Sequence, residues 1–172
     1  GASHGLAFAS GMAAADTLMR LLEPGDHILC CDDVYGGTFR LIDKVYKRQG
    51  IESSFVDFGN LNTIEDHIKP NTKMIWLESP TNPLLKLLDI KAICQLAKDK
   101  GCLSVVDNTF MSPYFQTPLA LGADIVLHSV TKFMNGHSDV VGGFVAVNTD
   151  ELNEKLRFLQ NSCGAVQGPM DS

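Results

Sequence analysis

The fold is decided by the stretch Asp124-Ile-Val-Leu-His-Ser129-Val-Thr131-Lys132-Phe-Met-Asn-Gly136-His137-Ser138. It begins with a short apolar run that is rich in β-branched residues and too short for a globular helix, so it predicts a buried strand. Two hydroxyls and an amine then follow within four residues, from Ser129, Thr131 and Lys132. The stretch therefore predicts a strand that ends in a polar loop.

The chemistry of this loop suits an anionic ligand that also carries a carbonyl group. The hydroxyls can bind the anion, and the amine of Lys132 can capture the carbonyl. A phosphate bearing an aldehyde has both properties, and pyridoxal phosphate is the common biological example. The same lysine can equally be a solvated surface residue, as most lysines are.

Composition indicates one globular domain. The chain has 172 residues, of which 45% are hydrophobic and 20% charged, and a chain of this length buries about 70% of its unfolded surface. The net charge of −6, without a basic run, disfavours nucleic acid and anionic membranes as partners. No apolar run approaches the roughly 20 residues that cross a bilayer, and no secretory leader is recognisable, so we expect a cytoplasmic protein.

The five cysteines are odd in number and form no Cys-x-x-Cys pair. Reduced, buried thiols are the simplest expectation. His128 and His137 have no further metal ligands at useful spacing, and Asp32-Asp33 is more typical of a turn than of a catalytic carboxylate pair. No metal site is expected.

Strands alternate with helices along most of the chain. We predict strands at 27–31, 51–56, 73–78, 103–106, 125–127 and 142–147, helices at 11–22 (with Ser10 as N-cap), 39–48, 60–69, 90–100 and 149–161, and a helical turn at 118–122. This alternation predicts a single α/β domain with a mainly parallel sheet flanked by helices.

Four side chains suited to a ring-shaped cofactor each lie just after a predicted strand: Tyr35, Asn82, Asp107 and Lys132. In open α/β sheets ligands bind at the carboxyl ends of strands. An aromatic side chain there can stack on a flat ring, an amide held between prolines can donate a hydrogen bond, and a carboxylate can pair with a protonated pyridine nitrogen. Taken singly, these residues also suit a half-buried loop tyrosine, a turn asparagine and a loop-capping aspartate.

Gly11 adds a possible anion site. It opens the helix predicted at 11–22, where free amides of the first turn can point at a phosphate and the missing side chain permits close approach. Close packing of the turn would explain the glycine equally well.

Two competing motifs fit poorly. Ser129-Val-Thr-Lys132 matches the Ser-x-x-Lys motif of penicillin-recognising proteins, but Ser138-Asp139 is followed by Val140 in place of Asn, and no Lys-Thr-Gly occurs. Gly1-Ala-Ser-His-Gly5 matches the Gly-x-Ser-x-Gly nucleophile elbow, yet no strand is predicted before it. Neither a Gly-x-Gly-x-x-Gly motif nor a Walker loop is present, which argues against a dinucleotide- or nucleotide-binding protein.

Five blocks match a known family in order and spacing: Phe8-Ala-Ser-Gly-Met-Ala-Ala, Asp33-Val-Tyr-Gly-Gly-Thr, Glu78-Ser-Pro-Thr-Asn-Pro, Val106-Asp-Asn-Thr-Phe and Ser129-Val-Thr-Lys-Phe-Met-Asn-Gly-His-Ser-Asp. Together they resemble the cystathionine γ-lyase and γ-synthase family of enzymes that depend on pyridoxal 5'-phosphate (PLP). The resemblance spans nearly the whole chain. It implies the large PLP-binding domain of fold-type I, aspartate aminotransferase-like enzymes.

The resemblance also implies a role for each site residue. Lys132 forms the Schiff base with the cofactor, Asp107 holds the pyridinium, Tyr35 stacks on the ring, Asn82 reaches its phenolic oxygen and Thr109 lies near the ring. The phosphate is bound by the backbone amides of Gly11 and Met12 and by the hydroxyls of Ser129 and Thr131. Val130 departs from the pattern, since a smaller residue is expected there.

The implied activity is carbon–sulfur bond cleavage in sulfur amino acids. The first choice is cystathionine γ-lyase, which converts cystathionine to cysteine, 2-oxobutyrate and ammonia by γ-elimination, and the alternative is cystathionine γ-synthase. Gly37 argues against a methionine γ-lyase, which tends to carry Cys at this position. Met111–Gln116 and Arg157–Ser162 look more like γ-lyase.

Family members are about twice this length, so the chain is expected to be a central piece. An N-terminal arm, with a Tyr and an Arg for the neighbouring subunit's phosphate, and a C-terminal domain, with an Arg for the substrate carboxylate, would be missing. The family implies a homotetramer. For residues 1–172 alone we expect a cofactor-binding fragment without turnover.

Overall fold

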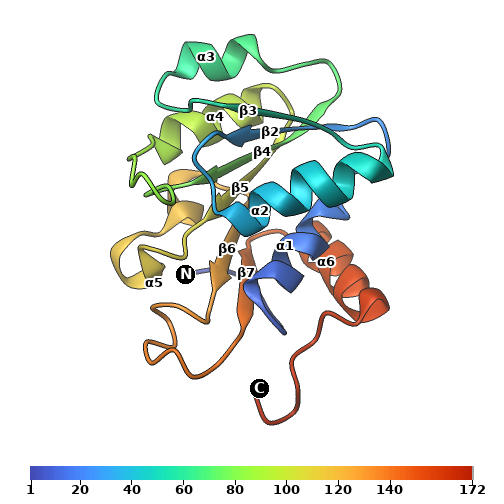
Figure 1. Cartoon of the computed structure of the whole chain (residues 1–172), viewed down its shortest axis with the longest axis vertical. Helices are drawn as coiled ribbons and strands as arrows, with labels where there is room; N and C mark the ends of the chain where they lie inside the picture. The colour runs from blue at the N-terminus through green and yellow to red at the C-terminus, as the bar shows by residue number, and fades with distance from the viewer. Residues whose placement is uncertain (172) are drawn as a thin grey trace.

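The computed structural model describes residues 1–171, and a seven-stranded sheet runs through its centre (Figure 1). The strands are β1 (His4–Phe8), β2 (His27–Cys31), β3 (Glu52–Val56), β4 (Thr72–Glu78), β5 (Leu103–Asp107), β6 (Ile125–Ser129) and β7 (Gly143–Val147). Their order across the sheet is β1-β7-β6-β5-β4-β2-β3.

The sheet is mainly parallel, as the sequence predicts. β7 alone of the described strands runs against its neighbours β1 and β6, whereas β2, β3, β4, β5 and β6 pair in parallel. The chain moves outward from β2 to β3 and then returns to β4 on the other side of β2. Such a reversal of strand order opens a crevice at the carboxyl ends, where α/β proteins bind ligands.

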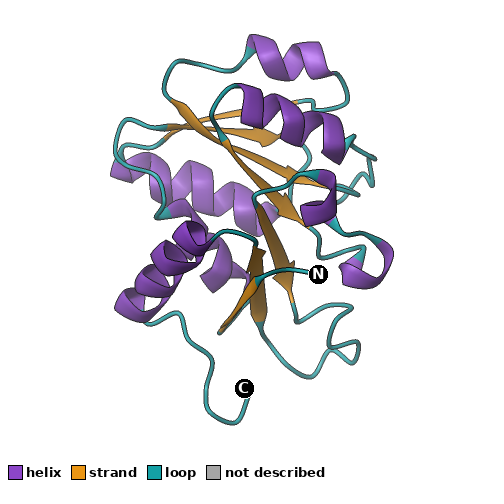
Figure 2. Ribbon diagram, turned by 180° about the vertical axis from the view of Figure 1, so that it is seen from behind, coloured by secondary structure: helices purple, strands orange, loops and turns teal. Residues whose placement is uncertain are grey.

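Helices cover both faces of the sheet. They are α1 (Gly11–Met19), α2 (Gly36–Arg40), which continues as the π-helix η1 (Leu41–Val45) and the 3-10 helix η2 (Tyr46–Gln49), α3 (Leu61–Asp66), α4 (Ile90–Asp99), α5 (Ser112–Phe115), the 3-10 helix η3 (Pro118–Leu121) and α6 (Asp150–Cys163). α1 and α2 lie on the face seen in Figure 1, and α4 covers the face seen in Figure 2. This layering explains why the central strands read as continuous apolar runs.

The core lies between the sheet and these helices. Every residue of β2 is buried, and Trp76 on β4 is among the largest fully buried side chains. Ile93 and Cys94 bring the apolar face of α4 against the sheet. Four of the five cysteines are buried as expected, whereas Cys163 at the end of α6 is exposed.

β1, α2 and α5 differ most from the sequence prediction, and α5 (Ser112–Phe115) is a single helical turn where no helix was predicted. β1 was not predicted, because a five-residue run with His4 and Gly5 has weak strand character; it is held by antiparallel pairing with β7 along its whole length. Ser3, just before it, donates its N–H to Asn148 Oδ1 at 3.0 Å, so Gly1–Gly5 leads into a strand and is no nucleophile elbow. α2 begins at Gly36, three residues before the predicted helix at 39–48, and also contains the glycines that suggested a turn.

Among residues 1–171, no helix is long and apolar enough to cross a membrane. The same residues contain no group of three or more metal-ligating side chains.

Candidate active site

The start of α1 sits directly on the ends of β6 and β7. Ser10 caps the helix by accepting the Ala13 N–H at 2.9 Å, which leaves the Gly11 and Met12 amides without intrahelical partners. A Cβ on Gly11 would lie 2.8 Å from Ser129 Cβ, and one on Gly143 would lie 2.2 Å from the Ser10 carbonyl oxygen. Two glycines therefore let a helix N-terminus approach the strand ends closely, which makes a cradle for an anion.

Thr109 joins the ends of β5 and β6. Its hydroxyl donates to Asp107 Oδ1 at 2.6 Å, and its N–H donates to the same oxygen at 3.0 Å. The same hydroxyl oxygen accepts the Ser129 N–H at 2.8 Å. Asp107 is consequently fixed in direction, and Ser129 is held between Thr109 and Gly11.

Glu78 lies beside Asp107, because the two residues end β4 and β5 in register. Both carboxyls are buried. Burial raises the pKa of Asp107, against the opposing effect of the Thr109 hydrogen bonds. Burial also raises the pKa of Glu78, and the Asp107 and Asp33 carboxylates add to that shift. Neither carboxyl has an ion-pair partner among residues 1–171, so a cationic group bound here would be strongly favoured.

Tyr35, in the loop after β2, contacts Glu78 through its backbone. Its N–H donates to Glu78 Oε2 at 2.9 Å. A Cβ on Gly37 would lie 2.3 Å from Tyr35 Cε1 and 2.9 Å from Met12 Sδ, so the ring of Tyr35 and the side chain of Met12 flank the same glycine. The tyrosine remains 42% exposed, which leaves ring surface free for a ligand.

These contacts and neighbouring positions link seven residues in a ring, which we call the circuit. It lies at the carboxyl edge of the sheet, meaning the edge formed by the carboxyl ends of the parallel strands. From the start of α1 it passes through the ends of β6, β5 and β4 and returns along the loop after β2. Its members are Gly11, Ser129, Thr109, Asp107, Glu78, Tyr35 and Met12. The structure thus brings together six residues that the sequence nominated, and adds Glu78.

Lys132 lies just outside the circuit. Its N–H donates to the Ser129 carbonyl at 3.2 Å, which starts a turn directly after β6. Its side chain is exposed and borders a cavity of about 440 Å³, together with Thr131 and residues 138–141. The Thr131 hydroxyl donates to the Gly142 carbonyl at 3.3 Å and accepts the Gly142 N–H at 3.1 Å, so it supports the loop.

Asn82 occupies the loop after β4 and is half-buried. Its side chain makes no hydrogen bond to any residue in 1–171. The amide is therefore available to a ligand, while no direct contact joins it to the circuit.

Sequence reasoning missed two buried carboxyls. Glu78 ends an apolar strand as Asp107 does, and the same argument, that a carboxyl after a buried strand needs a partner, would have found it. Asp33 was taken only as part of a turn with Asp32, although it is buried and accepts hydrogen bonds from Thr81 and Leu84. Asp33 is buried whereas Asp32 is exposed, and the sequence alone does not show this difference.

Residues 1–172 match the sequence profile described as "Cys/Met metabolism PLP-dependent enzyme". The chain belongs to this family. It is 56% identical over 170 residues to a probable cystathionine gamma-synthase of Herpetosiphon aurantiacus, covering 99% of this chain and 53% of that protein. It is likewise 56% identical over 171 residues to a cystathionine beta-lyase of Bacillus subtilis, covering 99% of this chain and 44% of that protein.

A crystal structure of cystathionine gamma-lyase from Lactobacillus plantarum, complexed with L-serine, superimposes with a TM-score of 0.97 at 53% identity. The match covers 98% of this chain and 44% of the other. This likeness confirms the fold-type I assignment. The chain spans about half the length of the relatives it matches.

The family's cofactor is PLP, and the residues present fit it. The cradle at Gly11 offers amides to a phosphate, the unpaired Asp107 carboxyl suits a ring nitrogen that carries a proton, and Tyr35 offers a ring face. Lys132, in the loop after β6, has an amine of the kind that could bind an aldehyde.

Proposed function

We propose that the full-length protein is a cystathionine γ-lyase, which converts cystathionine and water to cysteine, 2-oxobutyrate and ammonia. The observation that carries the proposal is the closed circuit of contacts around the carboxyl edge of the sheet. It gathers an anion cradle, an unpaired buried carboxyl and a free aromatic face in one place. Membership of the PLP-dependent family supports the same reading.

In this proposal the cofactor phosphate is held at the start of α1. The Gly11 and Met12 amides and the Ser129 hydroxyl bind its oxygens, with Thr131 as a further hydroxyl beside the loop. Thr109 keeps Ser129 and Asp107 in place through the hydrogen bonds described above. The phosphate thus replaces the partners that the helix end lacks.

The ring is held between Tyr35 and the strand ends. Tyr35 stacks on one face, Asp107 holds the proton on the ring nitrogen, and the Asn82 amide donates to the phenolic oxygen. When bound, PLP supplies an aldehyde for the substrate amine and a ring that accepts electrons from Cα. Asp107 stays ionised against a cation, which offsets the cost of burying its charge.

Lys132 is the group that moves protons. Its amine would hold the cofactor aldehyde and, once free, would take the substrate Cα proton. A second proton, taken from Cβ and returned to the γ-sulfur, would let that sulfur leave as the thiol of cysteine. Lys132 is exposed beside the cavity of about 440 Å³, so its amine has room both to hold the aldehyde and to take the proton.

γ-Lyase is preferred over the related activities for specific reasons. Gly37 stands where methionine γ-lyases tend to carry Cys, and a Cβ there would lie 2.3 Å from Tyr35 Cε1 and 2.9 Å from Met12 Sδ, so a Cys would require both side chains to shift. Met111–Gln116 and Arg157–Ser162 lean the same way. Cystathionine γ-synthase is the second candidate, since the chain is 56% identical to the probable gamma-synthase of Herpetosiphon aurantiacus, although it is equally similar to the beta-lyase of Bacillus subtilis.

Product analysis with the purified full-length protein separates these activities. Cystathionine as sole substrate gives 2-oxobutyrate and cysteine with a γ-lyase, but pyruvate and homocysteine with a β-lyase. Formation of cystathionine from cysteine and an activated homoserine, faster than its breakdown, would assign γ-synthase instead. Absence of all three reactions in PLP-loaded protein would contradict the proposal.

Residues 1–172 alone are proposed to be one PLP-binding domain that holds the cofactor without turnover, because the lysine loop and Tyr35 are open to water. The full-length protein is proposed to act in transsulfuration in the cytoplasm as a homotetramer. Steady 2-oxobutyrate release by the 172-residue chain would overturn the first statement, and light scattering of the full-length protein tests the last.

A further inference from the structure

Two buried carboxyls tie the loop after β2 to the end of β4. Glu78 Oε2 accepts the Tyr35 N–H at 2.9 Å. Asp33 Oδ2 accepts the Thr81 hydroxyl and also the Leu84 N–H, the latter at 2.9 Å. We call Asp33, Glu78 and Thr81 the carboxylate clamp.

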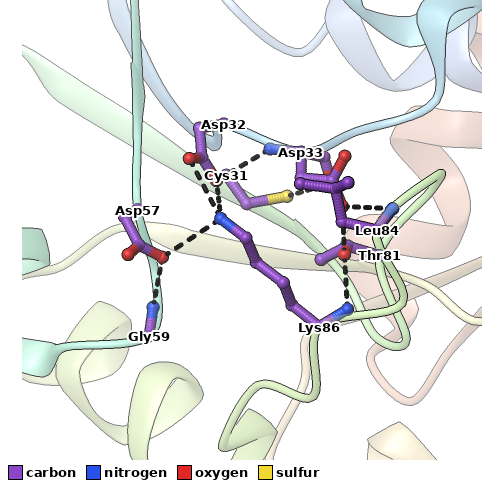
Figure 3. Close-up of polar contacts among 8 residues, drawn as sticks. All are labelled: Cys31, Asp32, Asp33, Asp57, Gly59, Thr81, Leu84 and Lys86. Carbon is purple, nitrogen blue, oxygen red and sulfur yellow. Dashed lines mark hydrogen bonds and ion pairs between the residues drawn. The ribbon is translucent and has the colours of Figure 1, made fainter.

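Figure 3 shows how the Asp33 arm of the clamp is supported. The Thr81 hydroxyl oxygen accepts the Lys86 N–H at 2.8 Å, and the Lys86 ammonium reaches Asp32 at 3.2 Å and Asp57 at 3.6 Å. Asp32 and Asp57 are exposed, and exposed ion pairs contribute little. The buried bonds to Asp33 are therefore the ones that fix the loop.

The clamp acts on two segments that carry proposed cofactor ligands. Tyr35 lies two residues after Asp33, and Asn82 directly follows Thr81. The Tyr35 side chain is 42% exposed, and the Asn82 side chain has no hydrogen-bond partner in residues 1–171. No hydrogen bond of either side chain to residues 1–171 fixes its position, so the backbone contacts of the two loops matter for where Tyr35 and Asn82 lie.

We propose that Asp33 and Glu78 are positioning residues, which hold Tyr35 and Asn82 in the places from which they contact the cofactor ring. Glu78 holds the backbone of Tyr35 by accepting its N–H. Asp33 holds the loop that contains Asn82 against the loop that contains Tyr35 by accepting hydrogen bonds from Thr81 and Leu84. The inference rests on the proposed PLP site. It adds that this side of the site is assembled by two carboxyls that are not among the proposed cofactor ligands.

Glu78 can do this without adding a charge next to Asp107. Burial, then Asp107 and then Asp33 raise the Glu78 pKa, so the neutral carboxyl is favoured when Asp107 is ionised. The carbonyl oxygen of a neutral carboxyl still accepts the Tyr35 N–H. An amide has the same shape and the same acceptor, which makes Glu78→Gln the natural conservative variant.

The test measures PLP dissociation constants and the visible circular dichroism of bound PLP in full-length variants. Glu78→Ala removes the acceptor of the Tyr35 N–H, and Thr81→Val removes the hydroxyl bond to Asp33 while the Leu84 N–H bond remains. For each we expect the dissociation constant to rise about tenfold with loss of the induced dichroism. Glu78→Gln and Thr81→Ser keep the acceptor or the hydroxyl and stay within about twofold of wild type. Asp32→Ala removes an exposed charge and the hydrogen bond from the Asp33 N–H at 2.8 Å but leaves the Asp33 side chain and its partners in place, so it also stays within about twofold.

A double-mutant cycle separates positioning from general stability. If Glu78 acts through Tyr35, Glu78→Ala has little further effect on PLP affinity once Tyr35→Ala is present, whereas independent effects would add. Additive effects, or unchanged affinity in both Glu78→Ala and Thr81→Val, overturn the proposal. If Glu78→Ala does not fold, two other comparisons remain. Thr81→Val against Thr81→Ser tests the Asp33 arm of the clamp. Glu78→Gln tests the Glu78 arm, since loss of PLP binding in the folded Glu78→Gln variant would also contradict the proposal. Wild-type protein that binds no PLP at Lys132 would refute the site itself, a result distinct from failure of the clamp.

Discussion

The start of α1 and the loop after β6 meet at Ser129 but are built differently. On one side, which we call the closed half, the start of α1 and the ends of β5 and β6 are linked through Gly11, Thr109 and Asp107, of which Thr109 and Asp107 are buried. On the other side, the open half, the loop of residues 130–142 exposes Lys132. The closed half is suited to holding a cofactor, and the open half leaves its reactive amine free to move.

The largest effect is expected from the open half. Lys132→Ala removes the proposed base and should lower kcat of the full-length protein by at least about 10²–10⁴-fold, while PLP still binds without a covalent bond. Equilibrium dialysis after removal of free cofactor measures that binding. Lys91→Ala, an exposed lysine on α4, is the matched control. Full loss of PLP affinity in Lys132→Ala would break the comparison, because the closed half could then not hold the cofactor alone.

Asp107→Asn probes the closed half chemically. The amide keeps an acceptor for Thr109 but cannot balance a protonated ring nitrogen, so we expect kcat to fall by about 10–100-fold. The cofactor-free protein should not lose stability, because the substitution removes a buried charge beside Glu78. Thermal unfolding of the cofactor-free protein checks this. An unchanged kcat would make Asp107 a loop cap and nothing more.

Neighbouring glycines test the packing of the two halves. Gly143→Ala puts a Cβ 2.2 Å from the Ser10 carbonyl oxygen, so it should destabilise the cofactor-free protein by about 1–3 kcal/mol. At Gly142 the nearest atom is 3.1 Å away and belongs to the Gln167 side chain, so Gly142→Ala should cost under about 0.5 kcal/mol. Urea denaturation compares them. Equal losses would show that the two halves are packed alike.

A further effect, on stability alone, is a pH dependence caused by two buried histidines of the sheet, His27 and His128. Burial lowers the pKa of His27 and of His128 to about 4 each, and Lys69 adds to the shift at His27. Between the folded-state pKa of about 4 and the unfolded-state pKa of about 6.5, the unfolded chain binds more protons at these histidines than the folded chain does. Stability of the cofactor-free protein should therefore fall as pH drops from about 6.5 to 4, by up to about 1.4 kcal/mol per pH unit for each histidine.

Substitution of the histidines assigns this slope. His27→Gln or His128→Gln should each flatten the pH dependence of the urea midpoint, whereas His137→Ala, in the exposed loop of the open half, should leave it unchanged. A slope that survives both buried substitutions would place its origin elsewhere.

Much of the fold followed from the sequence, because the buried strands are continuous apolar runs and the helices carry clear caps. Ser10, Asn60 and Thr149 each accept a first-turn amide as N-caps. β1 could not be found this way, since pairing with β7 stabilises it more than its own residues do. The α2 start was missed because Gly36 and Gly37 signal a turn locally, whereas packing against Tyr35 and Met12 selects a helix there.

The site was predictable as a set of residue types at the carboxyl ends of strands, and less so as a set of contacts. Asp107 and Thr109 were nominated, but their link to Ser129 depends on strand register, which no local pattern encodes. Glu78 and Asp33 each begin a block that matches the family, but the match gave neither residue a role of its own. Their roles became visible only through burial and hydrogen bonds.

The most direct test of the central claim is borohydride reduction of the PLP-loaded full-length protein, followed by mass spectrometry of its peptides. The account predicts that the visible absorbance band disappears and that a reduced pyridoxyl adduct is found on Lys132. An adduct on another lysine, or a protein that shows neither band nor adduct at saturating PLP, would contradict the assignment of this edge of the sheet as the cofactor site.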